Sequence, residues 1–334
     1  MLKDVLKYLR CPQCKHELVL VSKAGKVYPI EEVYDGLLSC SACKRIFPIT
    51  NGIPRFVEKQ NDLVEQTRSS FGKKWNKVSN YGFDKVTKKF HLDWFMERFG
   101  FKNKSDLKAY LKTKEFILDA GCGTGRLSNQ LAELCGGHIF ALDISDSVDV
   151  AASRLKDKDV TVIQADLNHL PFAYAFFDLI VCDMVIHHTP KPRESYKHLA
   201  MHLDSMGHLL CYVYKKKGVA REFSDDRLRE FTTKMSFEEC LKFSQIVTKF
   251  GKELSEFDPK LQRVVYWEIF KCFWNMSHGW DYSVITNFDW YHPHYAYRYD
   301  VQDVKEWTAE NYLKLRWLFE GDSGTSWIGE EAKR

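Results

Sequence analysis

The stretch that decides the fold is residues 116–145, FILDAGCGTGRLSNQLAELCGGHIFALDIS. A short apolar run leads into a glycine-rich turn, and leucines then recur every third or fourth residue, as on one face of a helix. Glycines at Gly121, Gly123 and Gly125 let the backbone turn sharply and approach a ligand, while a helix N-terminus presents free N–H groups. We therefore predict a strand, a tight ligand-binding loop and a helix.

Acidic residues around this stretch indicate the kind of ligand. Asp119 precedes the glycines in the order D-x-G-x-G-x-G, which differs from the dinucleotide fingerprint G-x-G-x-x-G. The next predicted strand, HIFALDIS, ends at Asp143, where a carboxylate can accept hydrogen bonds from ribose hydroxyls. A nicotinamide-dependent enzyme is the main alternative. It would need hydride-transfer machinery, and it usually lacks the acidic residue before the glycines.

Strands and helices alternate farther along the chain. The strand VTVIQADL ends at Asp166, the unbroken apolar run FDLIVCDMVIHH is typical of a buried parallel strand, and the helix SYKHLAMHLDS precedes the strand GHLLCYVYK. This order predicts an α/β fold with a doubly wound, mostly parallel sheet. Ligands bind at the carboxyl ends of the strands in such sheets.

Taken together, residues 116–217 resemble class I S-adenosylmethionine-dependent methyltransferases. The resemblance implies a seven-stranded Rossmann-like sheet with S-adenosyl-L-methionine as cofactor. In similar enzymes an acidic residue at the position of Asp166 forms a hydrogen bond with the adenine amino group, and the residue at the position of Leu167 flanks the adenine ring. The cofactor-binding residues implied are Asp119, Ala120, Gly121, Gly123, Gly125, Asp143, Ile144, Asp166, Leu167 and Asp183.

Four of the ten cysteines form two C-x-x-C pairs near the N-terminus, Cys11 with Cys14 and Cys40 with Cys43. Two such turns brought together supply four thiolates and close a tetrahedral site, so they predict a structural Zn²⁺. The alternative is four unmetallated cysteines. The other six cysteines lie in apolar or helical context and are expected to be reduced packing residues.

The 25 residues between the two pairs exceed the usual ribbon spacing, and a hairpin turning at Ala24-Gly25 would accommodate them. The cysteine pairs and the closing FPITNGIPRF resemble a family of small zinc-ribbon domains. Members of that family bind and activate RNA, DNA and protein methyltransferases, and some are fused ahead of a bacterial methyltransferase domain. The resemblance is specific for the fold and weak for the substrate.

We expect five segments along the chain. They are a zinc ribbon (1–58), a linker and helical lid (59–115), a cofactor-binding core (116–217), a helical and aromatic cap insertion (218–297), and the last helix and strands of the core (298–334). The insertion is too long for a simple loop. It is interpreted as a cap over the acceptor, with a dimer interface as the competing interpretation.

Two histidines, His187 and His188, are the catalytic candidates, because the fourth predicted strand ends in them, in the sequence HHTP. Histidine titrates in the range useful to a general base. The alternative is that one caps the strand end and the other lines the pocket without proton transfer. Similar methyltransferases that modify exocyclic amines of bases or glutamine carry N-P-P-Y or D-P-P-Y at this position, and its absence here implies that such acceptors are disfavoured.

Aromatic residues outside the core are candidates for covering the substrates. Phe71 and Trp75 lie in TRSSFGKKW, similar to a segment that covers the cofactor pocket in fused relatives, although core packing explains them equally well. The loop bearing Tyr291, His292 and Tyr295 resembles a stretch that borders the active site in those relatives. The H-x-H pair that His292 forms with His294 lacks an acidic or cysteine companion, which favours hydrogen bonding over metal binding.

Composition and charge bear on partners. The 334 residues are 45% hydrophobic and 28% charged, with net charge +4, and no stretch approaches the roughly 20 apolar residues of a membrane helix. Residues 1–115 carry 23 Lys+Arg against 13 Asp+Glu, which indicates either an anionic partner such as RNA or a solvated lysine-rich face. Without a signal-like segment at the N-terminus, we expect a soluble, cytoplasmic protein without a membrane partner. A homodimer is left open.

Three functions are consistent with these features. The first is transfer of a methyl group to an oxygen or nitrogen of a small metabolite or sugar-derived acceptor. The second is methylation of rRNA or tRNA, with the ribbon and the basic N-terminal third binding RNA. The third is a non-enzymatic scaffold that binds the cofactor.

Overall fold

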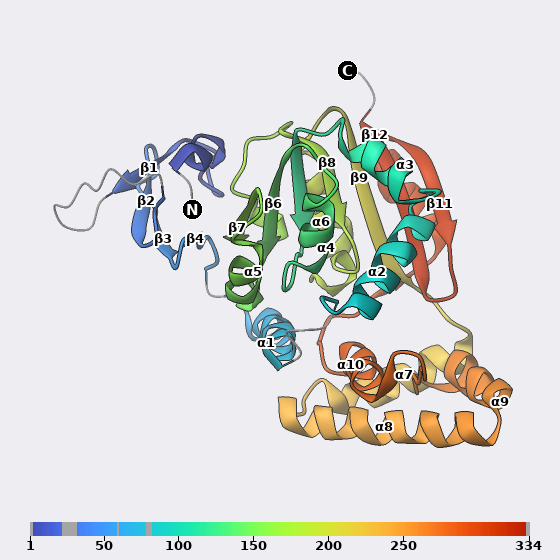
Figure 1. Cartoon of the computed structure of the whole chain (residues 1–334). Helices are drawn as coiled ribbons and strands as arrows, with labels where there is room; N and C mark the ends of the chain where they lie inside the picture. Colours follow the sequence, from blue (N-terminus) through green and yellow to red (C-terminus); the bar gives the residue numbers. More distant parts are fainter. Residues whose placement is uncertain (1–2, 22–31, 59, 78–81, 332–334) are drawn as a thin grey trace.

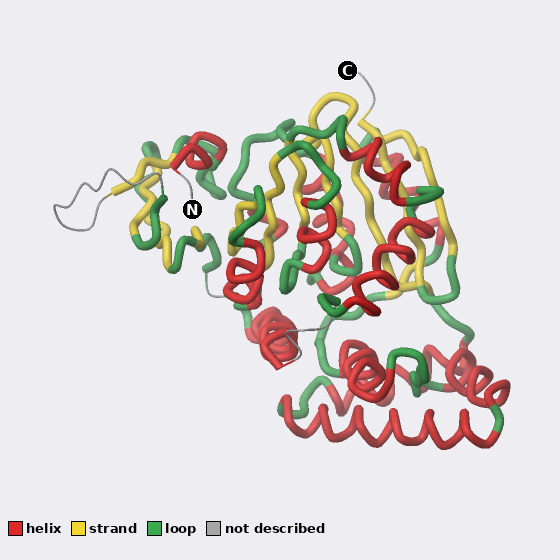
Figure 2. Tube along the Cα trace, in the orientation of Figure 1, coloured by secondary structure: helices red, strands yellow, loops and turns green. Residues whose placement is uncertain are grey.

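The computed structural model describes residues 3–21, 32–58, 60–77 and 82–331. The chain forms a small ribbon, a large α/β core and a helical cap (Figure 1). The ribbon lies beside one edge of the core sheet, and the cap lies below the sheet in this view. Figure 2 shows that strands are confined to the ribbon and the core, whereas the cap is helical.

The core is built on a sheet in the order β11-β12-β9-β8-β5-β6-β7, as expected for a doubly wound fold. The strands from β7 to β9 run parallel, whereas β12 pairs antiparallel with β9 and β11. A short β10 (Arg298–Tyr299) also pairs with β9, so the sheet has eight strands where seven were expected. The other strands are β5 (Phe116–Ala120), β6 (His138–Asp143), β7 (Val160–Gln164), β8 (Phe177–Cys182), β9 (Leu203–Lys215), β11 (Leu313–Glu320) and β12 (Gly324–Glu331).

Helices cover both faces of this sheet. Successive residues of β5 bury their side chains in opposite cores, Ile117 in one and Leu118 in the other, as the period of two in a strand requires. The helices are α2 (Lys85–Arg98), α3 (Lys104–Leu111), α4 (Arg126–Ala132), α5 (Ser147–Leu155), α6 (Pro192–Ala200) and α11 (Val301–Glu310). The predicted α/β fold class is therefore confirmed.

The fourth predicted strand is shorter than its apolar run suggested. β8 ends at Cys182, and Met184 has a positive φ of 63°, which breaks the extended conformation. The two candidate histidines consequently lie in a separate 3₁₀ turn, η3 (Ile186–His188), beyond the strand. Another 3₁₀ turn, η2 (Leu167–His169), follows β7.

The ribbon consists of η1 (Lys3–Tyr8) and an antiparallel sheet in the order β1-β2-β3-β4. Its strands are β1 (Leu18–Val21), β2 (Gly36–Cys40), β3 (Ile46–Thr50) and β4 (Ile53–Pro54). The hairpin turn expected at Ala24-Gly25 lies outside the described residues.

The ribbon is attached firmly to the core. The backbone N–H of Phe56 donates to the carbonyl of Gln164 at the end of β7 (2.7 Å), and that of Arg10 donates to Pro171 (2.9 Å). The Tyr8 ring lies 5.0 Å from the ring of Phe116 in β5. Apolar side chains of the ribbon and of one sheet face form one continuous cluster, so the two parts share a hydrophobic core.

The cap follows β9 and comprises α7 (Val219–Thr232), α8 (Phe237–Phe257), α9 (Pro259–Val264), the π-helical turn η4 (Val265–Ile269) and α10 (Gly279–Tyr291). Ser236 and Glu239 form a capping box at the start of α8. Helix α1 (Asp62–Lys77) lies between the ribbon and the cap in Figure 1. No helix in the described part of the chain combines the length and apolar character needed to cross a membrane.

Candidate functional site

A cavity of about 920 Å³ opens at the carboxyl ends of β5 to β9 and is bordered on its other sides by α1, α2 and the cap. We call the part lined by the strand ends and the glycine-rich loop the loop side. The part lined by the cap is called the cap side, and its residues include Tyr266, Lys271, Phe273, Trp274, Tyr282 and Asp289.

The glycine-rich loop turns sharply, as its sequence predicted. Gly121 and Gly123 have φ values of +94° and +55°. A Cβ atom on Gly121 would lie 2.4 Å from the side chain of Val185, so only glycine fits. A Cβ on Gly123 would lie 3.2 Å from Nε1 of Trp75, which places the indole of α1 directly against the loop.

Asp143, at the end of β6, borders the loop side of the cavity. Its Oδ2 accepts a hydrogen bond from the Gly123 N–H (2.8 Å), and its Oδ1 accepts from the N–H and the hydroxyl of Ser145 (2.8 and 2.7 Å). These three donors fix the carboxylate. The Ser145 hydroxyl also lies 2.7 Å from Ser147 Oγ. If a ligand hydroxyl took the place of Ser145 on the Asp143 carboxylate, the Ser145 hydroxyl could donate to Ser147 instead.

Asp119 borders the cavity from β5, with only 2% of its surface exposed. Burial raises the pKa of its carboxyl to about 6, although the Ser128 hydroxyl opposes this by donating to Oδ2 (2.5 Å). Asp119 has no cationic side chain paired with it among the described residues. At neutral pH it is therefore a buried carboxylate supported by hydrogen bonds from the hydroxyl and the backbone of Ser128 and by the nearby charge of Arg126.

Asp166 follows β7 and borders the same side of the cavity, next to Leu167. Burial alone would raise the pKa of Asp166, but hydrogen bonds from His169 and Asn168 hold it below its ordinary value. Asp166 therefore stays ionised at neutral pH. Ile144 also borders the cavity, whereas Ala120 and Gly125 do not.

Asp183 has a partner that the sequence did not indicate. The guanidinium of Arg98 in α2 donates to both carboxylate oxygens of Asp183, at 2.6 and 2.9 Å. Both side chains border the cavity although they are almost completely buried. Asp183 is thus one half of a bidentate ion pair.

The two candidate histidines have different environments. His187 is fully buried against the Tyr214 ring (3.9 Å between centroids) and does not border the cavity, and burial holds its pKa well below the ordinary value. His188 borders the cavity, and its Nδ1 lies 2.6 Å from the carbonyl oxygen of Tyr295. Burial lowers the pKa of His188 to about 3, so its ring is neutral. Because Nδ1–H donates to Tyr295, Nε2 keeps the lone pair.

Among the aromatic candidates, Phe71, Trp75 and Tyr295 border the cavity, whereas Tyr291 and His292 do not. The Phe71 ring packs edge-on against His188 (4.8 Å between centroids). Tyr291 donates its hydroxyl to the carbonyl of Lys271 (2.7 Å), and His292 bonds Ser70 Oγ through Nδ1 (2.7 Å). The last two residues thus hold the cap and α1 in place rather than facing the cavity.

Besides Arg98, the charged cavity residues Lys74, Asp289 and Lys271 were missed by the sequence reasoning. The ammonium of Lys74, 1% exposed, lies 2.7 Å from the carboxylate of Asp289 and 3.4 Å from the Trp75 ring centroid. This ion pair connects α1 to α10. Lys271 is a lysine within the aromatic run EIFKCFW, and that unusual context was the available signal.

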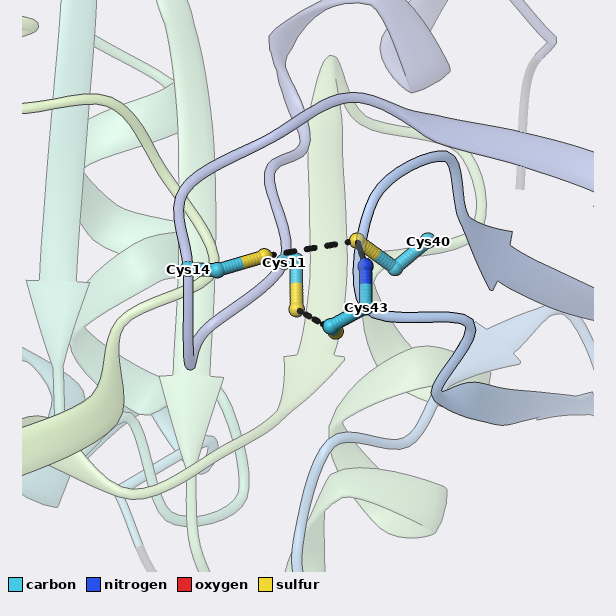
Figure 3. Close-up of side chains that lie close together, drawn as sticks. All are labelled: Cys11, Cys14, Cys40 and Cys43. Carbon is cyan, nitrogen blue, oxygen red and sulfur yellow. Dashed lines mark hydrogen bonds between the residues drawn. The ribbon is translucent and has the colours of Figure 1, made fainter.

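The four cysteines of the ribbon converge on one point (Figure 3). The sulfurs of Cys11 and Cys43 are 3.6 Å apart, those of Cys14 and Cys40 are 3.4 Å apart, and all four lie within 4.8 Å of one another. A tetrahedral zinc site with bonds of about 2.3 Å requires sulfurs about 3.8 Å apart. The cluster therefore fits a structural Zn²⁺ with four thiolate ligands.

Comparison with known proteins finds matches for two segments of the chain. Residues 118–211 match a family model described as a methyltransferase domain, and residues 3–52 match the model of Trm112p-like proteins. The chain thus joins a Trm112p-like zinc-binding domain to a core with the S-adenosylmethionine-dependent methyltransferase fold, as the sequence predicted.

Individual relatives cover only part of the chain. The ribosomal protein L11 methyltransferase of Thermotoga petrophila is 31% identical over 116 residues, which are 34% of this chain and 44% of that protein. The demethylmenaquinone methyltransferase of Lactobacillus johnsonii is 28% identical over 107 residues, 30% of this chain and 44% of that protein. This chain therefore spans less than half the length of these curated relatives.

Two solved structures are similar at lower identity. A complex between the Haloferax volcanii Trm112 methyltransferase activator and the putative methyltransferase is 12% identical, with 82% of this chain and 99% of that chain covered and a TM-score of 0.45. A SAM-dependent methyltransferase from Aquifex aeolicus is 14% identical, with 71% and 92% covered and a TM-score of 0.40.

Proposed function

We propose that this protein is an S-adenosylmethionine-dependent methyltransferase that modifies an oxygen or nitrogen of a small acceptor. The observation that carries the proposal is the convergence of Asp143, Asp166 and the glycine-rich loop on one cavity that also extends under the cap. When bound, the cofactor would supply an electrophilic methyl group. The work left to the protein is to hold the acceptor close and aligned.

The loop side has the groups needed to hold the cofactor. Asp143 would accept hydrogen bonds from ribose hydroxyls, with the Ser145 hydroxyl free to turn toward Ser147. Asp166 would accept a hydrogen bond from the adenine amino group, and Leu167 would pack against the adenine ring. Trp75, which already contacts the loop at Gly123, would cover the cofactor as part of the α1 lid.

Of the two candidate histidines, His188 is the one that borders the cavity and could contact the acceptor. A histidine with a pKa of about 3 is a weak base, so we assign it the role of a hydrogen-bond acceptor for the O–H or N–H that is to be methylated. His187, which does not border the cavity, would support the turn that carries His188.

Calorimetric titration of the full chain with S-adenosylmethionine and with its demethylated product tests the proposal. Asp143→Ala should weaken binding about 10- to 100-fold, because it removes charge-assisted hydrogen bonds. Asp157→Ala, on the exposed surface after α5, is the matched control and should bind normally. Absence of cofactor binding in the unmodified chain would refute the proposal.

The acceptor requires a search in cells. Metabolite profiling of a deletion strain against the wild type should show species that differ by one methyl group in place of a hydrogen. Cofactor binding without labelled methyl transfer to any component of a cell extract would instead favour the scaffold hypothesis.

RNA methylation is the competing activity, and the cap over the cavity favours the small acceptor. RNA binding driven by the basic N-terminal third would weaken steeply with salt. We expect no such binding in a filter or polarisation assay at low salt. Tight, steeply salt-dependent binding of rRNA or tRNA would contradict the small-acceptor proposal.

A further inference from the structure

A buried lysine, Lys271, lies on the cap side of the cavity with only 8% of its surface exposed. Its backbone is fixed on both sides, because its N–H donates to Asp225 Oδ1 (3.1 Å) and its carbonyl accepts the Tyr291 hydroxyl (2.7 Å). Its ammonium lies 4.8 Å from the centroid of the Trp290 ring. The side chain is therefore held in place and is not a mobile surface lysine.

The carboxylates near Lys271 are already committed to other cations. Asp225 is paired with Arg221, and Asp289 is paired with Lys74 at 2.7 Å. Burial and, to a smaller extent, the neighbouring Arg221 lower the pKa of Lys271 to about 7, against the opposing effect of Asp225 and Asp289. A buried ammonium without its own counter-ion is costly, and a bound anion would remove that cost.

The same positive charge acts on the rest of the acceptor site. Together with Arg229 and Lys74, Lys271 lowers the pKa of His188. On this side of the cavity the pairs Lys74–Asp289 and Arg221–Asp225 balance internally. Arg229 has no carboxylate partner either, but its guanidinium is held by backbone carbonyls and does not border the cavity. Among the described residues, Lys271 is therefore the buried cation of the cap side that borders the cavity without a paired carboxylate, which suits a monoanion such as a carboxylate better than a phosphate dianion.

Other aromatic rings line the same cavity. Trp94, Phe273 and Tyr282 border the cavity from α2, the loop before α10, and α10 itself. The Phe273 and Tyr282 rings are 5.9 Å apart, and the Trp94 and Tyr212 rings are 6.1 Å apart. Pockets of this kind hold a flat apolar body, while a few polar groups fix its orientation.

We propose that the methyl acceptor is a small aromatic carboxylate whose carboxyl group pairs with Lys271 and whose ring packs among the aromatic side chains of the cap side. This inference rests on the proposed function, since it names the class of acceptor for the same cavity. The carboxylate is the group by which the acceptor is recognised. The methylated atom is the one that His188 contacts.

Ligand-observed NMR titration of the full chain, saturated with S-adenosylhomocysteine, tests the inference with three probes that share one ring: benzoate, benzyl alcohol and phenyl phosphate. We expect benzoate to bind about tenfold more tightly than neutral benzyl alcohol. Lys271→Met should abolish that preference and leave benzyl alcohol binding unchanged. It removes a buried charge and keeps a long apolar side chain, so the variant is expected to fold.

Lys249→Met is the matched control, because Lys249 is an exposed cap lysine, and it should keep the preference for benzoate. Equal binding of benzoate and benzyl alcohol, or an unchanged preference in Lys271→Met, would overturn the inference. Tighter binding of phenyl phosphate than of benzoate would overturn the choice of a monoanion. S-adenosylhomocysteine binding is measured separately, so failure of the acceptor inference is distinguishable from failure of the proposed function.

Discussion

At the scale of single residues, the burial of Asp119 makes the stability of the fold depend on pH. Its pKa is raised from 3.8 to about 6, so its contribution to stability is fully present below about pH 4 and is lost as the pH rises through about 6. Above that pH the folded chain holds a buried carboxylate at a cost of order 2–3 kcal/mol. Residues that are destabilising in the free protein are often kept for ligand binding.

We therefore expect Asp119→Asn to stabilise the ligand-free protein at pH 7 by about 2 kcal/mol and to change little at pH 4. Urea unfolding measured across this pH range would show the difference growing with pH. Asp157→Asn, on the exposed surface, should give a curve parallel to that of the unmodified chain. A constant difference between Asp119→Asn and the unmodified chain would contradict the assignment.

Individual site residues could be predicted from the sequence where a local pattern marks them. Asp119, Asp143 and the glycines were found because they stand at fixed positions relative to a strand and a turn. Arg98, the partner of Asp183, was not found, because nothing local marks an arginine whose carboxylate lies on another element.

Among the elements, α1 is tied to the cap by a buried ion pair, in addition to the bond between His292 and Ser70. The Lys74 side chain is 1% exposed, whereas that of Asp289 is 26% exposed. Removing the Asp289 carboxylate leaves the Lys74 ammonium buried without its partner. Removing the Lys74 ammonium leaves a carboxylate that water can reach. The two substitutions should therefore have unequal effects.

Asp289→Asn should destabilise the protein by about 3 kcal/mol, and Lys74→Met by about 1 kcal/mol. Hydrogen exchange of the described backbone of α1 should be faster in Asp289→Asn. Chemical denaturation gives the free energies, with Lys89→Met as a control that breaks an exposed pair with Asp93. Equal costs for the first two variants would exclude this explanation.

The elements themselves were largely predictable, but their arrangement was less so. The helical spacing of Phe71 and Trp75 indicated α1, and the long aromatic insertion indicated helices. The end of β8 was misplaced, because an apolar run does not reveal the positive φ at Met184. The packing of α1 against α10 depends on contacts between distant segments, which no periodicity records.

Across the whole molecule, the ribbon and the sheet share one hydrophobic core, so they should unfold together. Leu9 of the ribbon is fully buried and pairs with Phe172 of the core. We expect Leu9→Ala to cost about 2–5 kcal/mol and to lower the melting temperature of the whole chain in one transition. Tryptophan fluorescence, which reports on the core and the cap, would measure this thermal transition.

Loss of the metal should act in the same way. Chelation of Zn²⁺, or Cys40→Ser, should lower the same single transition, because metal binding energy in such sites is folding energy. Cys135→Ser removes a cysteine outside the cluster and is the control. If the fluorescence transition stayed in place while only the ribbon melted, the shared core would not couple the two parts.

The contact between Phe56 and Gln164 has one more consequence. β7 is the outermost strand on its side of the sheet, and its end is capped by the backbone of the ribbon. Uncovered strand edges recruit other chains and begin aggregates. We therefore expect the ribbon to hinder pairing of another chain with this end of β7, so that loss of the metal would promote self-association of the protein.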